Sequence, residues 1–422
     1  MFDSIKKIFS SKELTKKIIF VVSILIIFRI LSHIPMPGVD IVSLKDFFDK
    51  NQAFGLLNMF TGGAMRNFSI VMLGVGPYIT ASIIFQLLQM IVPSLEALSK
   101  EGEQGREKIN HYTRIATVPL AFLQSYAMIA LLRNQGIVIE GNTFDLITNL
   151  CSLTAGTMLL TWMGELISEK GIGNGVSLII ALGIISGFPM QLAQTIAVAD
   201  STRIIGLVIF GVLGLLVTAS IVFINEGERQ VPITYARRVR GNKSYGGVDT
   251  YLPIRVTLAG VIPIIFALSV MVIPSVLAKF LEQAKSGWLV NFGSWLNTTF
   301  SNDVYYSIIY FFLVIAFTFF YTSVVFQPNQ IAENLQKRGG FIPGIRPGKE
   351  TSDYLVDVLF KVTFVGALFL AVIAVLPYIV QAMTNLKTLA VGGTGILIVI
   401  SVILETKRQI EAQLIMHKYD NY

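Results

Sequence analysis

"MLGVGPYITASIIFQLL" (residues 72–88) is a long apolar stretch that contains no Asp, Glu, Lys or Arg. An uncharged run of this length is typical of a helix that crosses a lipid bilayer. Its first residues include Gly74, Gly76 and Pro77, which are unfavourable inside a helix. The stretch therefore predicts a membrane span that is interrupted near its start.

The composition of the whole chain agrees with this interpretation. Of its 422 residues, 53% are hydrophobic and only 14% are charged, and the mean hydropathy is +0.67. Soluble domains carry about 25% charged residues, so the composition argues against a soluble multidomain protein. The single cysteine, Cys151, excludes an internal disulfide framework and a cysteine metal cluster. The histidines His33, His111 and His417 show no HExxH spacing, and we expect no metal or other cofactor.

Ten segments have the composition of a membrane span, so we predict an all-α polytopic membrane protein. They lie at about 18–34, 70–92, 112–132, 151–168, 175–196, 204–224, 256–278, 304–326, 355–380 and 388–405. The first segment follows Lys12, Lys16 and Lys17, as in a signal peptide. No small-residue cleavage site comes after it, so we interpret it as a retained span.

The distribution of Lys and Arg predicts the orientation. With the N-terminus in the cytoplasm, 23 of these residues fall on the cytoplasmic side and 8 on the outer side. Because cytoplasmic loops carry an excess of Lys and Arg, both termini are expected in the cytoplasm. Ten spans divide into an N-terminal half, 1–198, and a C-terminal half, 199–422. Halves with five spans each would be inverted repeats if they share a fold.

Two interruptions occupy equivalent places in the two halves. "GLLNMFTGGAMRNF" (55–68), just before the second span, is too short to cross the bilayer and is broken by Gly62 and Gly63. Non-helical backbone at membrane depth requires burial in protein or a water-filled cavity; the alternative is an external loop with an interfacial half-helix. The seventh span contains Gly260, Pro263 and Pro274. Paired interruptions point to a transport path, although Gly and Pro are also frequent in membrane helices generally.

Few charges fall within the spans. Arg29 lies toward the outer end of the first span, while Glu165 and Lys361 lie near cytoplasmic ends, where they can reach the interface by snorkelling. A proton-coupled transporter normally needs charges at mid-membrane. The sequence therefore argues against a charge relay.

Two cytoplasmic loops stand out, at 225–255 and 327–354. The first predicts a β-hairpin with a cationic tip, formed by Arg237, Arg238, Arg240 and Lys243. The second predicts a short helix that ends at Gly339, followed by a tip at "GGFIPGIRPGKE" (339–350).

The 339–350 tip resembles a phosphate loop but departs from that motif at Pro343 and Glu350, so we exclude nucleotide binding there. Attraction to anionic lipid explains basic loops in general, at about 1 kcal/mol per residue. It does not explain why Pro343 and Pro347 restrict the backbone on both sides of Arg346. This restriction favours docking to a large acidic partner, such as ribosomal RNA or a motor protein.

Several stretches together resemble the SecY family of protein channels. They are "IPMPGVD" (34–40), "NMFTGGA" (58–64), "GPYITASIIFQLL" (76–88), "EGEQGREKINHYTR" (101–114), "GELISEKGIGNGVSLII" (164–180), "GERQVPITYARRV" (227–239), "AGVIPIIFA" (259–267), "AENLQKRGGFIPGIRPGKET" (332–351) and "GGTGILIV" (392–399). The resemblance implies a clamshell of two five-span halves in the bacterial plasma membrane, and a channel rather than an enzyme. Unfolded secretory chains would pass through its centre, and apolar segments would leave sideways between spans two and seven.

The same resemblance implies three groups of site residues. The family's apolar pore ring corresponds to Val75, Ile79, Ile180, Ile265 and Ile398, with Val75 in place of the more usual isoleucine. The half-helix at about 58–68 would be a plug, with Asn58, Met59, Phe60, Thr61, Gly62, Gly63, Ala64, Met65 and Arg66. The lateral gate would contain Thr80, Gln86 and Thr257, the last at a position that is often asparagine.

Partners are also implied by the resemblance. They are the SecE and SecG subunits, the SecA motor ATPase, the ribosome, an unfolded preprotein with its signal sequence, and membrane lipid. Arg346, next to Gly344, would engage SecA. Arg237, Arg238, Arg240 and Lys243 would contact the ribosome and SecA. The C-terminal segment 406–422 is expected to form a short cytoplasmic helix.

Two other classes of protein remain as alternatives. A secondary transporter fits ten spans in inverted halves, but coupling charges are lacking and the cytoplasmic hairpin has no role. An intramembrane enzyme would need paired carboxylates, a Ser-His arrangement or a metal cluster within the spans, and the sequence offers none of these.

Overall fold

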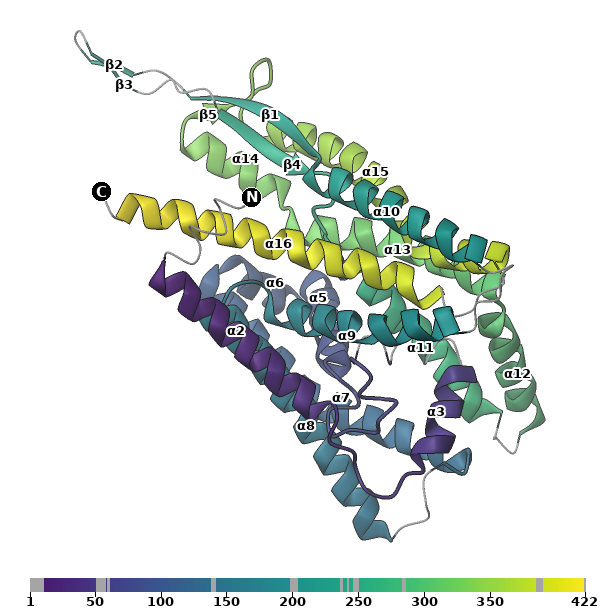
Figure 1. Ribbon diagram of the computed structural model, residues 1–422. Coiled ribbons are helices and arrows are strands. Elements are labelled where there is room, and N and C mark those ends of the chain that lie inside the picture. The colour runs from purple at the N-terminus through teal and green to yellow at the C-terminus, as the bar shows by residue number, and fades with distance from the viewer. Residues whose placement is uncertain are drawn as a thin grey trace.

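Helices occupy the segments that were predicted to span the membrane. The computed structural model describes residues 11–50, 58, 61–137, 142–197, 204–235, 238–240, 243–245, 250–282, 286–384 and 390–420. Each of the ten predicted spans overlaps one helix (Figure 1). These are α2 (Lys12–Leu31), α5 (Gly76–Ile91), α7 (Glu103–Asn134), α8 (Thr143–Lys170), α9 (Gly175–Ala197), α10 (Ile204–Glu226), α11 (Ile262–Leu281), α13 (Asp303–Val325), α15 (Lys349–Thr384) and α16 (Ala390–Asp420).

Fewer helices meet a strict test of length and composition for crossing a membrane. Among the described residues, four do so, and they contain α7, α8, α13 and α15. A fifth is obtained if α5 and α6 (Pro93–Lys100), which are bent by 101° relative to each other, form one span. Shorter apolar stretches lie in α9, α10 and α11. The chain is thus mostly helical, with several helices suited to a bilayer.

The second span starts later than predicted. Residues 70–75 were expected inside it, but they form turns, and α5 begins only at Gly76. Gly74 has φ +57°, a left-handed conformation that does not continue a helix, and Pro77 favours a helix start. The seventh span is similar, because Gly260 has φ +58° and α11 begins at Ile262. The predicted interruptions are therefore confirmed at the starts of both spans, whereas Pro274 lies within the continuous helix α11.

The two loops that were predicted to be cytoplasmic join in one small sheet. β1 (Glu228–Tyr235) pairs antiparallel with β4 (Thr250–Arg255), and β5 (Gly340–Phe341) adds to the other edge of β1. The predicted hairpin is confirmed, and its tip carries the short antiparallel pair β2 (Arg238–Arg240) and β3 (Lys243–Tyr245). The predicted short helix is α14 (Pro328–Lys337). We call β1, β4, β5, α14 and residues 338–348 the platform.

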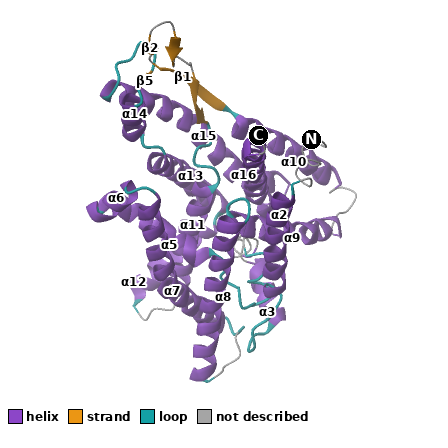
Figure 2. Ribbon diagram, turned by 90° about the vertical axis from the view of Figure 1, so that its left-hand side faces the viewer, coloured by secondary structure: helices purple, strands orange, loops and turns teal. Residues whose placement is uncertain are grey.

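The platform lies at one end of the helical bundle. Figures 1 and 2 show it at the same end as the start of α2 and the end of α16. Helices α3 (Ile41–Lys50) and α12 (Gly287–Ser301) lie toward the opposite end. An apolar cluster of buried residues, including Val231, Ile254, Ile342 and Leu355, anchors the sheet on α15. The platform is therefore attached to the bundle by apolar packing as well as by its connecting loops.

A second group of apolar side chains fills the centre of the bundle. Buried residues from α2, α8, α9, α11, α13, α15 and α16 form one contiguous cluster. Glycine in α8 lets the backbone around Ile70 approach this helix closely. A Cβ atom on Gly156 would lie 2.1 Å from the carbonyl oxygen of Ile70. The turns at 61–75, which we call the turn segment, are thus held directly against α8.

Candidate functional site

A cavity of about 790 Å³ enters the bundle between α5, α7, α8, α9 and α11. Its walls carry polar and charged side chains, among them Glu107, Asn110, Asn174 and Ser177. Other lining residues, Ile79, Ile180 and Ile265, are branched and apolar. The cavity therefore combines a hydrated wall with an apolar part, and three of the five predicted ring residues supply the latter.

All five predicted ring residues belong to the central apolar cluster. Val75, Ile180 and Ile398 are buried, with exposed fractions of 4%, 2% and 0%, while Ile79 and Ile265 are partly buried. They come from four helices: Val75 and Ile79 from the start of α5, and one residue each from α9, α11 and α16. Branched apolar groups that line a constriction exclude water and hence ions. The arrangement is suited to a constriction that seals without a polar filter.

The turn segment lies against this cluster, because its residues Ala64 and Val71 are also members. Within the predicted plug, Asn58 and residues 61–66 are described, whereas Met59 and Phe60 lie outside the described residues. The carbonyl of Asn58 accepts a hydrogen bond from the Thr61 hydroxyl (3.0 Å), and its side-chain oxygen accepts one from the Arg66 amide (2.8 Å). These bonds close the segment on itself.

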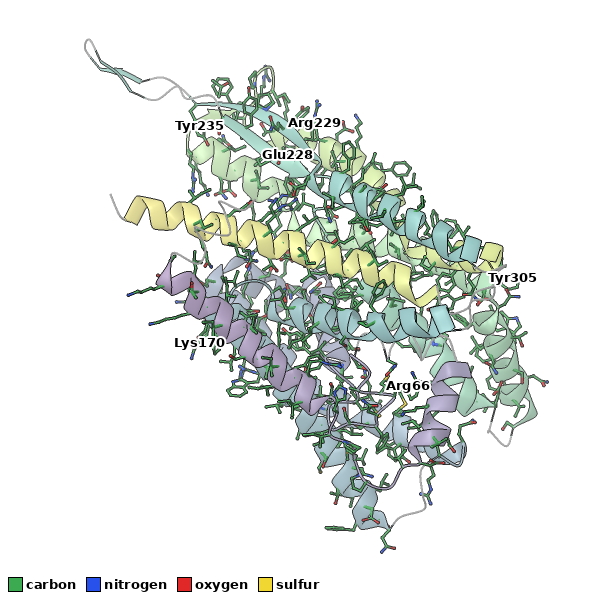
Figure 3. All side chains as sticks on the ribbon, in the orientation of Figure 1. Arg66, Lys170, Glu228, Arg229, Tyr235 and Tyr305 are labelled. Atoms are coloured by element: carbon green, nitrogen blue, oxygen red, sulfur yellow. The ribbon has the colours of Figure 1, made fainter. Side chains whose placement is uncertain are left out.

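The expected half-helix at 58–68 is wrong for residues 61–68, whereas Asn58 is helical and residues 59–60 lie outside the described residues. Residues 61–68 form turns, because Gly62, Gly63 and Phe68 have φ of +67°, +83° and +44°. Successive left-handed residues cannot continue a right-handed helix. Figure 3 places Arg66 within the bundle, well away from Arg229 and Tyr235 of the platform.

The predicted lateral-gate residues fall into two places. Helices α5 and α11 are in contact, and Thr80 and Gln86 both lie on α5. Thr80 donates to the Gly76 carbonyl (3.1 Å) and lies 3.5 Å from the side-chain amide of Gln124 on α7. Gln86 lines the cavity, donates to Ser82 (3.2 Å), and its side-chain oxygen is buried without a hydrogen-bond partner among the described residues.

Thr257, by contrast, does not join Thr80 and Gln86 across the seam. Its hydroxyl donates to the side chain of Asn225 at the end of α10, and Asn225 donates in turn to Ser401 of α16 (2.9 Å). Arg408 of α16 also donates to the Asn225 carbonyl (2.6 Å). Thr257 precedes the start of α11 by several residues, so the turn at its position carries it toward α10 and α16. The structure groups it with this network.

Sequence reasoning missed two charged contacts. Arg114 of α7 lies 2.9 Å from Glu165 of α8, and both side chains line the cavity. Glu165 was expected only to snorkel, but it is half of an interhelical ion pair. Arg29 of α2 donates to the Gly62 carbonyl (2.8 Å) and to the Ser186 hydroxyl of α9 (2.9 Å). Its isolation within an apolar span was the signal that could have identified it as a contact residue.

Arg346 lies at the exposed tip of the platform. Gly344 and Gly348 on either side have φ of +83° and +104°, and the Thr351 hydroxyl donates to the Arg346 carbonyl (2.8 Å). The backbone that carries this arginine is thus fixed by both turns and a hydrogen bond, as the prolines and glycines predicted.

Other platform charges are partly compensated. On α14, the ammonium of Lys337 lies 2.8 Å from Glu333 and lowers the pKa of that exposed carboxyl below its usual value. The cationic character of the tip therefore rests on Arg346 and Lys349, while Arg338 lies just before the tip at the C-cap of α14. Arg238, Arg240 and Lys243 lie in β2 and β3, and Arg240 pairs with Lys243 in their register. Arg237 lies outside the described residues.

The chain resembles known protein translocase subunits along its whole length. The model of the SecY family matches residues 69–407. Protein translocase subunit SecY of Streptomyces scabiei is 40% identical over 442 residues, covering 100% of both chains. The subunit of the same name from Halalkalibacterium halodurans is 42% identical over 435 residues, again covering 100% of both.

Solved structures show a similar fold. A structure described as that of a protein conducting channel superimposes with a TM-score of 0.62 at 16% identity and covers 93% of this chain and 91% of that one. Sec61 in the canine ribosome-channel complex from the endoplasmic reticulum gives a TM-score of 0.58 at 16% identity, with the same coverage. At these identities the likeness concerns the fold alone.

Proposed function

The chain belongs to the SecY family, and from this premise we propose that it forms a protein-conducting channel of the plasma membrane. Unfolded secretory polypeptides pass through it, and apolar segments leave sideways into the bilayer. The observation that carries the proposal is the cavity, which combines a polar wall with the apolar residues Ile79, Ile180 and Ile265. A polar entrance tolerates any backbone, while a deformable apolar ring closes around a chain of any sequence.

The proposed architecture has ten spans in two inverted halves, 1–198 and 199–422, with both termini in the cytoplasm. Placing the platform, the start of α2 and the end of α16 on the cytoplasmic side agrees with the excess of Lys and Arg there. The polar cavity residues Glu107 and Asn110 lie near the start of α7, and Glu169 lies near the end of α8. The cavity is therefore proposed to open toward the cytoplasm.

Each group of site residues has one task in this mechanism. The ring Val75, Ile79, Ile180, Ile265 and Ile398 blocks ions. The plug, at about 58–68 and including Gly62, Gly63 and Ala64, closes the path on the outer side of the ring. The contact between α5 and α11 is the seam that opens sideways, with Thr80 and Gln86 on its polar side.

The platform is proposed as the docking surface for the cytoplasmic partners. The Sec61 relative was solved in a ribosome-channel complex, and basic loops that contact phosphate-rich RNA suit such a partner. Arg346 is proposed to engage the SecA motor, and Arg237, Arg238, Arg240 and Lys243 to contact the ribosome and SecA. SecE and SecG complete the complex. The chain itself is a conduit, and its partners supply the energy.

The function is tested by crosslinking a stalled secretory chain to cysteines introduced at Ile79 and Ile265. The exposed native Cys151 is first replaced by serine. A channel gives crosslinks at both positions and none at a control cysteine placed at Leu215, whose side chain is 74% exposed on α10. A secondary transporter would instead take up a small solute and give no crosslink at 79 or 265, and that result would refute the proposal.

Substitutions at the seam between α5 and α11 are expected to have a modest effect on the insertion of apolar segments into the membrane. Gln86→Leu removes a buried side-chain oxygen that has no partner among the described residues and so stabilises the closed seam, while Thr80→Val removes the hydroxyl near Gln124. Interhelical hydrogen bonds in membranes contribute about 0.6 kcal/mol. We expect Gln86→Leu to raise the hydrophobicity that a test segment needs for insertion, and Thr80→Val to shift it by a smaller amount.

An insertion assay with graded test segments measures this threshold. Thr154→Val on α8 is the control, because that hydroxyl bonds only within its own helix, to the Leu150 carbonyl. An unchanged threshold in Gln86→Leu would contradict a role of this side chain in gating.

A further inference from the structure

Arg29 joins three separate elements near the outer end of the bundle. It lies in the last turn of α2, and its guanidinium donates to the carbonyl of Gly62 in the turn segment (2.8 Å) and to the hydroxyl of Ser186 on α9 (2.9 Å). No carboxylate pairs with it among the described residues. Its positive charge is therefore solvated by neutral oxygen atoms, one of which belongs to the turn segment.

The geometry around this contact is specific. The Ser186 hydroxyl donates its hydrogen to the Gly183 carbonyl (2.7 Å), so its oxygen is left to accept from Arg29. Gly62 packs directly on α9, since a Cβ atom at this position would lie 3.0 Å from the Gly183 Cα and 3.5 Å from the Arg29 guanidinium. Gly62 also has φ +67°. Glycine here brings its carbonyl to the guanidinium at a distance that larger residues would prevent.

The apolar surroundings make the hydrogen bonds of Arg29 energetically important. The Arg29 side chain borders an apolar groove with Val22, Leu25 and Leu182. A cation in apolar surroundings is costly unless polar groups solvate it, and hydrogen bonds from a charged donor are about twice as strong as neutral ones. Moving Gly62 away would remove one of the two acceptors of Arg29.

The rest of the turn segment is held differently. Its later residues pair by backbone with the chain that follows α2: the Met36 amide donates to the Phe68 carbonyl (2.8 Å), and Ser69 forms an antiparallel bridge with Pro35. Residues 61–66 have no such backbone pairing to α2 or α9 among the described residues, and Arg29 is the side chain that ties them to both helices. Among the described residues, the contact thus lies in the part of the segment that backbone pairing does not hold to these helices.

We propose that Arg29 is a positioning residue that holds residues 61–66 in the closed arrangement, with Ser186 orienting its guanidinium. The inference rests on the proposed function, in which this segment is the plug. Opening the channel breaks the Arg29–Gly62 bond, so Arg29 sets how often the plug leaves its place in the absence of a substrate.

The test measures access to a cysteine at Ala64, whose side chain is 0% exposed. In a Cys151→Ser, Ala64→Cys background, a membrane-impermeant maleimide is added from the outer side of proteoliposomes that contain the full channel complex. Arg29→Leu is expected to raise the labelling rate about tenfold, which corresponds to about 1.4 kcal/mol in the opening equilibrium. Ser186→Ala is expected to give a smaller rise, and Arg29→Lys a partial return toward the rate of the parent.

Arg133→Leu is the matched control. It removes an exposed cation from the last turn of α7, which is predicted to lie on the same side of the membrane. If Arg29→Leu does not yield folded protein, Ser186→Ala decides alone. Labelling that is unchanged in Arg29→Leu or, in that case, in Ser186→Ala overturns the inference, as does an equal rise in Arg133→Leu.

A further arm separates this inference from the proposed function. A stalled secretory chain added to the Ala64→Cys parent should also raise labelling if the segment is a plug. A rise with substrate but none in Arg29→Leu overturns the role of Arg29 and leaves the channel function intact. A rise in Arg29→Leu but none with substrate supports the Arg29 contact and refutes the plug.

Discussion

Arg346→Glu is expected to reduce SecA-driven translocation more than about tenfold while leaving the amount of folded protein in the membrane unchanged. The side chain is exposed, so its replacement removes no packing. A reversed charge at a docked cation costs several kcal/mol, and about 1.4 kcal/mol already corresponds to a factor of ten. Inverted vesicles supplied with SecA, ATP and a preprotein measure the effect as protease-protected product.

The matched control for this prediction is Arg338→Glu, which makes the same charge change at the exposed C-cap of α14 within the same platform. If the effect came only from the net charge of the platform, both variants would lose activity equally. A normal rate in Arg346→Glu, or an equal loss in both, would contradict a specific role of the tip.

The platform illustrates what local sequence predicts. Pro343, Gly344 and Pro347 predicted a fixed tip at Arg346, because each of these residues restricts or selects the backbone where it stands. The pairing of Thr234 with Phe341 was not predicted. β5 is only two residues long, and its partner strand lies about a hundred positions earlier, so no local pattern signals the contact. The sequence indicated two loops, whereas the fold makes one surface.

The helices show the same difference between features that local sequence predicts and features that depend on distant contacts. Hydropathy predicted a helix at each of the ten segments, and each overlaps one, since an apolar run depends on its own residues alone; four or five of these helices, among the described residues, are long and apolar enough to cross a membrane. The half-helix at 58–68 failed because two glycines and Phe68 take left-handed conformations that packing against α8 and α9 selects. Thr257 was assigned to the lateral gate from the resemblance to a family, and its hydrogen bond to Asn225 at the end of α10 was not predicted. Predicting either outcome requires knowing which elements lie side by side.

The ring is the part of the site where the chemistry of single residues was least informative. Val75, Ile180 and Ile398 are ordinary packing residues when considered one at a time, and each is buried as such. The proposed ring depends on four helices, α5, α9, α11 and α16, whose side chains meet in or against one apolar cluster. The ring was proposed from the resemblance to a family; the pattern of residues alone did not indicate it.

The second large effect is expected from opening this ring. In Ile79→Ser combined with Ile265→Ser, two partly buried isoleucines that line the cavity become small and polar. Burial of one CH₂ group contributes about 0.8 kcal/mol, so the two changes remove well over the 1.4 kcal/mol that separates rates by a factor of ten. We expect chloride efflux from proteoliposomes without substrate to rise about tenfold or more.

Ile84→Ser combined with Ile273→Ser is the control, because these side chains lie on the same two helices, α5 and α11, and are 40% and 58% exposed. Efflux that rises equally in both pairs would show that general loosening, not the ring, sets the leak. In the proposed function the ring and the plug are two barriers in series, since ions would have to pass both. Adding Arg29→Leu to the ring variant should therefore raise efflux by more than the sum of the separate effects, whereas a simple sum would mean that the two features do not close one path.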